Sequence, residues 1–150
     1  MYHLFLYVHI VCAVIWVGGA VYAQLLALRV TSSPDASELP HLARHIESIG
    51  TRVFLPAALL LFVSGSAMTL QAWSFGQTWI AVSVALWVLS AVVGAVYLGP
   101  RVKRAAELFE AEGPTSHVGR ELLDRLFMVS RLEIIGFAVI IGLMTFKPGA

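Results

Sequence analysis

Charged side chains are scarce in this chain, and long stretches lack them completely. Only 13% of the 150 residues are Asp, Glu, Lys or Arg, whereas 59% are hydrophobic. This apolar content exceeds what the core of one soluble domain of this length could bury. We therefore expect an integral membrane protein whose main solvent is the lipid bilayer.

The sequence also lacks basic runs and paired cysteines. The formal net charge is +1, and no dense run of Lys and Arg could neutralise several phosphates in a row, which argues against a nucleic-acid partner. The single cysteine, Cys12, excludes an intrachain disulfide and any CxxC metal or redox motif. The N-terminus has no basic region and no small-residue cleavage site, so we expect the first helix to remain in the mature protein.

Charge-free runs predict four transmembrane helices, each of which needs about 20 apolar residues. Residues 1–28 form one run, and residues 53–100 form a second that is long enough for two spans joined by a turn at 73–77. The last run, 134–146, is too short, so its span must reach back past Glu133 and Arg131 to about Phe127. The sequence thus predicts an all-α, four-helix membrane bundle in a single domain. The spans are about 3–28, 52–73, 78–100 and 127–146, and the long loops are 29–51 and 101–126.

The distribution of basic residues predicts the orientation. Lys and Arg concentrate in cytoplasmic loops, and here nine fall on one side of the bundle and only Lys147 on the other. Both long loops should therefore be cytoplasmic, with both termini outside, as in a multi-pass protein of a bacterial inner (plasma) membrane. The nine residues are Arg29, Arg44, Arg52, Arg101, Lys103, Arg104, Arg120, Arg125 and Arg131.

His9 is the one histidine expected within the hydrocarbon region, roughly 8–10 Å below the outer interface by helical rise. An unpaired imidazole is costly in lipid, which makes an intramembrane histidine a functional candidate. Its neutral nitrogen suits haem iron or copper. A histidine that hydrogen-bonds Ser64, Ser66 or Ser83 on a neighbouring span would give the same sequence pattern, so both interpretations remain open.

Two further residues could complete a site with His9. Met68, at a similar depth on the second span, could be a sixth ligand to haem iron, although the iron could also be five-coordinate or bridge two protomers. Cys12 lies one turn from His9 and could join it on Cu(I). Each also has a plain structural interpretation, because methionine and free cysteine commonly fill apolar cores.

Glu133 lies about one turn inside the fourth span. Arg131 can extend to the interface, but the shorter glutamate needs a partner in the bundle. We expect an interhelical ion pair with Arg52 or Arg101, which end neighbouring spans at similar depth. On the cytoplasmic segment, His41 and His45 share a helical face, but no third strong ligand accompanies them, so a solvated helix is expected.

Several segments resemble known small bacterial membrane proteins. Residues 6–10 (LYVHI) and 13–19 (AVIWVGG) are similar to the first helix of copper-resistance D (CopD-like) domains, of HemJ-type protoporphyrinogen oxidases, and of an uncharacterised four-helix family of predicted integral membrane proteins. The resemblance to the uncharacterised family covers nearly the whole chain. It also includes QLLALR at 24–29, RVFLPA at 52–57, YLGPR at 97–101, VSRLE at 129–133 and FKPG at 146–149.

The resemblance to HemJ-like proteins implies a haem ligand at His9, which occupies that motif position. The lysine that HemJ-type enzymes carry in a later span has no counterpart here, which argues against protoporphyrinogen oxidation. We therefore expect a haem b protein that acts in electron transfer or tetrapyrrole handling, with a membrane redox partner or a second copy of the chain. The alternatives are a copper-handling protein that uses His9 and Cys12, and an accessory subunit without a cofactor. No residue is assigned a catalytic role.

The orientation can be tested by cysteine labelling. Single cysteines engineered in residues 31–40 should be protected from an impermeant thiol reagent added outside intact cells, because the nine basic residues hold this loop in the cytoplasm. Labelling of these sites from outside would overturn the assignment.

Overall fold

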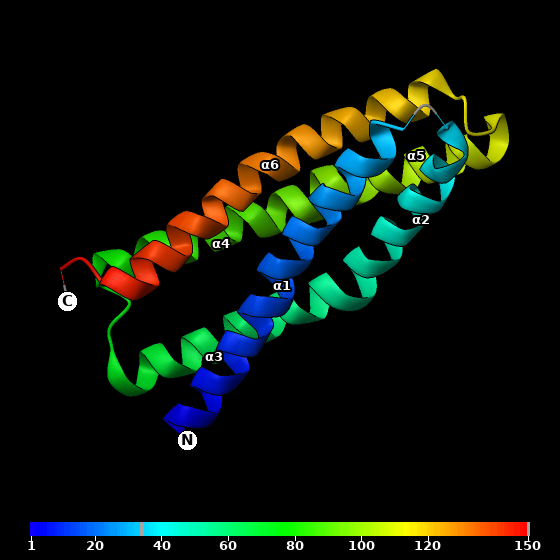
Figure 1. The fold of residues 1–150 in the computed structure, drawn as a ribbon. Coiled ribbons are helices and arrows are strands. Elements are labelled where there is room, and N and C mark those ends of the chain that lie inside the picture. The colour runs from blue at the N-terminus through cyan, green and yellow to red at the C-terminus, as the bar shows by residue number, and fades with distance from the viewer. Residues whose placement is uncertain (34, 150) are drawn as a thin grey trace.

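The computed structural model describes residues 1–33 and 35–149, which form helices and their connections without any strand. Pro34, in the expected 29–51 loop, and Ala150 lie outside the described residues. Figure 1 shows the arrangement of the helices. They are α1 (Tyr2–Thr31), α2 (Leu39–Ile49), α3 (Leu55–Ala72), α4 (Thr78–Val92), α5 (Gly99–Glu112) and α6 (His117–Phe146).

Within this described part, the helices join into four continuous rods. A 3-10 turn, η1 (Ala36–Glu38), leads into α2, and α2 continues into α3 as α4 does into α5. The rods Tyr2–Thr31, Ala36–Ala72, Thr78–Glu112 and His117–Phe146 are each long and apolar enough to cross a membrane. The predicted fold class, an all-α protein with four membrane-spanning helices, is thereby confirmed.

Two π-helical turns, η2 (Gly50–Phe54) and η3 (Val93–Leu98), allow two rods to pass a proline. Pro56 and Pro100 each lie two residues beyond a π turn. A proline has no backbone N–H, and its ring clashes with the carbonyl four residues earlier. The wider π turn, whose bonds run from i to i+5, accommodates this carbonyl, so the helix continues instead of ending.

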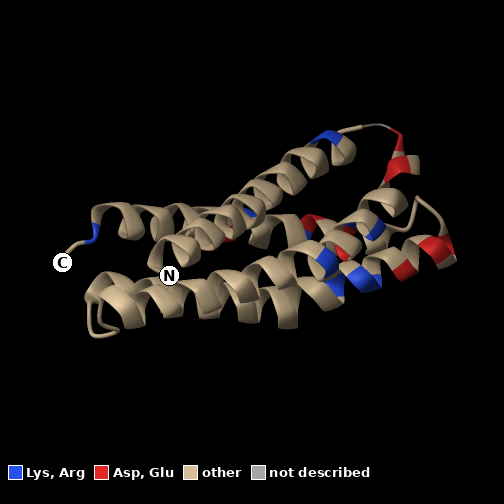
Figure 2. Cartoon of the chain, turned by 90° about the horizontal axis from the view of Figure 1, so that it is seen from below, with Lys and Arg blue, Asp and Glu red and all other residues tan. Residues whose placement is uncertain are grey.

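The rods are arranged as two pairs. α1 packs along α3, and α4 packs along α6. Figure 1 shows the pairs close together near α2 and α5 and spread apart toward the two chain termini. We call residues 1–20, 61–90 and 137–149 the terminal half and residues 21–60 and 91–136 the charged half. Figure 2 shows that nearly all acidic and basic residues lie in the charged half.

The hydrophobic core also lies in the charged half, where α2 and α5 pack together and α6 packs on α5. Alanines that are at most 1% exposed allow the helices to approach closely, and Leu123 on α6 is fully buried. The core cluster comprises Ala27, Leu39, Leu42, Ala43, Val102, Ala105, Ala106, Phe109, Leu123, Leu126 and Phe127. This half therefore holds the tightly packed core, although both halves expose apolar side chains on their outer faces.

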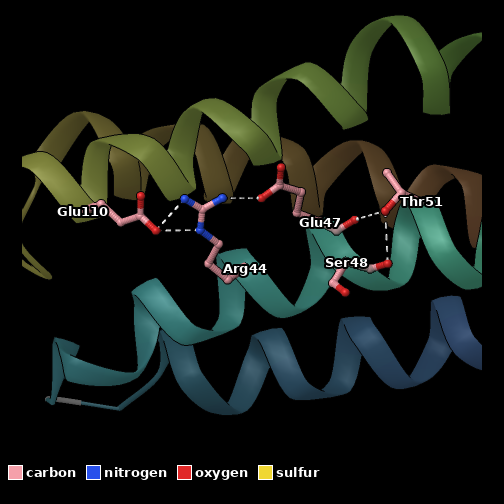
Figure 3. Close-up of polar contacts among 5 residues, drawn as sticks. All are labelled: Arg44, Glu47, Ser48, Thr51 and Glu110. Atoms are coloured by element: carbon pink, nitrogen blue, oxygen red, sulfur yellow. Dashed lines mark hydrogen bonds and ion pairs between the residues drawn. The ribbon is translucent and has the colours of Figure 1, made fainter.

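Arg44 links α2 to α5 at the surface of this core. Its Nε donates to Glu110 at 2.6 Å and its Nη1 to Glu47 at 2.9 Å, as Figure 3 shows. These hydrogen bonds, that to Glu110 first, raise the pKa of Arg44. Because Arg44 and Glu110 are exposed and Glu47 is partly exposed, these contacts contribute little to stability.

Replacing Leu123 with alanine should test whether this core holds the bundle together. Leu123→Ala should lower the free energy of unfolding by about 2–5 kcal/mol, because the fully buried side chain leaves a cavity. Denaturant titration in detergent micelles would measure the loss. The matched control is Leu132→Ala on the same helix, whose side chain is 65% exposed and whose place detergent or lipid can fill. Equal losses in the two variants would contradict this account.

Candidate functional site

A cavity of about 710 Å³ lies in the terminal half, between the two helix pairs. α1, α3, α4 and α6 all contribute to its wall, which is predominantly apolar. Its volume falls within the range of about 300–1,000 Å³ that is typical of small-molecule sites. It follows from the fold, because helix pairs that are joined in the charged half leave space where they spread apart.

Aromatic pairs connect the helix pairs at the deep end of this cavity. Trp16 of α1 packs on Phe137 of α6 with ring centroids 4.7 Å apart, and Phe62 of α3 stacks on Trp87 of α4 at 4.6 Å. By helical rise, each ring lies about 14–21 Å from the end of its helix in the terminal half. All four line the cavity, at its end nearer to the charged half.

His9 extends from α1 to α3 at an intermediate depth and lines the cavity. Its Nδ1 lies 3.0 Å from the carbonyl oxygen of Leu61 and 3.2 Å from the hydroxyl of Ser64. The hydroxyl can donate its own proton to the Leu60 carbonyl at 2.6 Å, so both neighbours of Nδ1 act as acceptors. We therefore assign the ring proton to Nδ1.

This tautomer leaves Nε2 of His9 with a free lone pair. Nε2 makes no hydrogen bond within the part of the chain that the structure describes. A neutral imidazole nitrogen in this state can bind a metal or accept a hydrogen bond. His9 therefore combines a fixed ring orientation with an available ligand atom at the wall of a large apolar cavity.

Gly65 provides the space for the ring on α3. A β-carbon added at this position would lie 3.0 Å from Cε1 and 3.3 Å from Nδ1 of His9. Any larger residue would therefore push the imidazole away from the Leu61 carbonyl. The role of Gly65 could not be predicted from the sequence, because a glycine in an apolar helix gives no indication of which side chain approaches it.

The structure brings Met68 to this cavity but not Cys12. Met68 lines the same wall as His9. Cys12 is 5% exposed and is not part of the wall, so His9 and Cys12 do not face one common space. Residues 1–33 and 35–149 contain no group of three or more His, Cys, Asp or Glu side chains that could hold a metal ion. His41 and His45 are exposed on α2.

Glu133 has a different partner from the one expected. Its Oε1 accepts a hydrogen bond from the hydroxyl of Ser90 at 2.8 Å, which joins α6 to α4. No arginine forms an ion pair with it among the described residues. The ion pair expected with Arg52 or Arg101 is therefore replaced by a hydrogen bond to Ser90. Residues at a similar depth in the membrane lie at one level, but their side chains need not point toward each other.

The arginines considered for Glu133 are oriented elsewhere. Arg101 lies 3.6 Å over the ring of Tyr97 and donates to the backbone carbonyl of that residue. Arg52 is exposed. Arg131 donates from Nε to the Gln24 side chain at 2.8 Å, with the Gln24 amide oriented so that it also donates to the Phe127 carbonyl at 3.2 Å. Gln24 thereby connects α1 to α6.

Three polar atoms of α4 are buried without a hydrogen-bond partner in the described part of the chain. They are Nε1 of Trp79, Oγ of Ser83 and Nε1 of Trp87, which belong to residues of the cavity wall spaced one turn apart. Leaving a buried donor unpaired costs about 1–3 kcal/mol. Native structures contain few such groups, so their concentration beside one cavity distinguishes it from ordinary packing.

Residues 3–148 match the sequence profile of a family described as predicted integral membrane proteins. No curated protein matches the chain, and no solved structure matches it.

The contact between Ser90 and Glu133 predicts the behaviour of two variants. Ser90→Ala should lower stability by roughly 1 kcal/mol, because it removes the hydrogen-bond partner of Glu133 inside the membrane. Glu133→Gln should have a smaller effect, since glutamine keeps an acceptor oxygen for Ser90. Unfolding titrations with sodium dodecyl sulfate would compare them with Ser130→Ala as the control. A larger loss in Glu133→Gln than in Ser90→Ala would show that a cation holds Glu133.

Proposed function

The chain belongs to the DUF2269 family of predicted integral membrane proteins, and in this membrane setting we propose that it binds haem b through Nε2 of His9. The function that follows is electron transfer or tetrapyrrole handling at a multi-pass membrane protein. The bacterial inner membrane is the location that we expect for it.

The observation that carries this proposal is the hydrogen bond between Nδ1 of His9 and the carbonyl of Leu61. A metal-bound histidine almost always donates its second ring N–H to a carbonyl, carboxylate or water, which fixes the tautomer and raises the basicity of the ligating nitrogen. His9 has this second bond in place, and its other nitrogen belongs to a residue of the cavity wall. The imidazole ring is therefore preorganised to bind a metal such as iron.

The volume of the cavity and its lining suit a large apolar group. Its wall is formed largely by aliphatic and aromatic side chains, including Trp16, Phe62 and Trp87. A haem would supply one-electron chemistry there, while His9 would hold its iron and the wall of the cavity would orient it in apolar surroundings. Met68 lines the same cavity and is our candidate for a second residue that would hold the iron. The resemblance of residues 6–10 to HemJ-like proteins supports the same position for the axial histidine.

His9→Ala is the direct test of this proposal. Protein expressed with haem available should show a Soret band, and His9→Ala should abolish it while the four-helix fold survives in detergent, because the change removes one ligand and little packing. His3→Ala is the matched control, since His3 lies on the same helix but is exposed and does not line the cavity. Absorption spectra and haem content per protein would be measured.

A second variant separates ligation from general damage. Gly65→Ala should lower haem content or shift the Soret band, because its β-carbon displaces the His9 ring. Gly136→Ala should do neither, because nothing lies within 4 Å of a β-carbon at that position. Wild-type protein that stays colourless with haem supplied would overturn the proposal. Stoichiometric copper in that protein would favour copper handling, and the absence of both would favour an accessory subunit.

A further inference from the structure

Lys147 lies at the open end of the cavity and is held there by two tryptophans. It caps α6 in a left-handed conformation, with φ of 44°, and its N–H donates to the Leu143 carbonyl at 2.9 Å. The amine Nζ lies 4.5 Å from the ring centroid of Trp73 and 5.8 Å from that of Trp79. Such cation–π contacts orient a lysine but leave its N–H donors free for an anion.

This amine is also the one charged side chain of the terminal half. Residues 1–20, 61–90 and 137–149 contain no Asp, Glu or Arg and no lysine other than Lys147. In Figure 2 a basic segment lies next to the C-terminus, apart from the other charges. None of the salt bridges among the described residues includes it. A lone cation beside an apolar cavity offers a partner for an anionic group of a ligand that otherwise fills the apolar space.

Lys147, Trp73 and Trp79 line the same cavity as His9. His9 is seven residues along α1 from Tyr2, so it lies about 10 Å below the mouth by helical rise. A ligand that reaches both residues needs an apolar body about that deep and an anionic group at one edge. Aromatic walls further favour a flat ring system over a flexible acyl chain.

We propose that Lys147 binds the carboxylate groups of a tetrapyrrole and so sets which edge of the ring faces the mouth. The choice of ligand rests on the proposed function, but the recognition itself does not involve iron. Metal-free porphyrins that carry free carboxylates are therefore also ligands of this cavity. The second source of a similar anion, the phosphate of a lipid headgroup, would bind Lys147 from the membrane surface without filling the cavity.

The experiment compares protoporphyrin IX with its dimethyl ester, using the full chain in nanodiscs of zwitterionic lipid. Binding would be followed by quenching of tryptophan fluorescence. Lys147→Gln should weaken binding of the dicarboxylate about tenfold, because a charge-assisted hydrogen bond is lost. The ester should bind wild type and variant equally. Lys147→Arg should restore most of the affinity, and Lys103→Gln, at the other lysine of the chain, should change nothing.

Equal affinity of wild type for the acid and the ester, or unchanged binding in Lys147→Gln, would overturn the inference. The second result, together with loss of phosphatidylglycerol binding in the variant, would assign Lys147 to a lipid phosphate. The haem proposal fails separately: wild type would then bind protoporphyrin IX through Lys147 but give no Soret shift with haem, and His9→Ala would have no effect. If wild type binds neither compound, both ideas fail.

Discussion

Lipid offers no hydrogen bonds, and this constraint governs the terminal half. A polar side chain there needs a partner within the protein, and the three unpaired polar atoms of α4 beside the cavity are exceptions. Ser64 and Thr69 bond to carbonyls one turn back on their own helix. His9 instead bonds to a carbonyl of a second helix, and it thereby fixes α1 on α3. No comparable hydrogen bond joins the two helix pairs at this level among the described residues. The cavity consequently opens between the pairs and not within either of them.

The two halves of the molecule divide the tasks of stability and binding. The charged half buries a continuous apolar core in which small alanines bring α2 and α5 together, so the rods are joined there. The terminal half has no such core. Aromatic pairs such as Trp16 with Phe137 connect its helices instead. The unpaired polar groups in the cavity wall lower the stability of the fold, and the packed core of the charged half offsets this cost.

The sequence was sufficient to predict what depends on composition along one rod. Charge-free runs predicted four spanning helices, and the cost of a polar group in lipid identified His9 as a residue in need of a partner. The direction in which each side chain points around its helix axis could not be predicted from the sequence. Depth placed Glu133 level with Arg52 and Arg101, but rotation turned it to Ser90. The roles of Gly65 and of the unpaired atoms of Trp79 and Ser83 depend on neighbouring residues of other rods. The role of Lys147 depends on the left-handed cap, which brings its amine over the tryptophan rings.

The π turn at residues 50–54 has a consequence for which surfaces meet. Leu42 on α2 and Ser64 on α3 are both buried, and the π turn lies between them along the rod. An α turn and a π turn differ by one residue, which corresponds to about 100° of rotation. The π turn thus rotates α3 relative to α2, and along this rod α2 packs on α5 while α3 packs on α1. The number of residues between Ile49 and Leu55 therefore sets the rotation of α3 relative to α2. Deleting one of these residues would turn Ser64 and Gly65 away from His9.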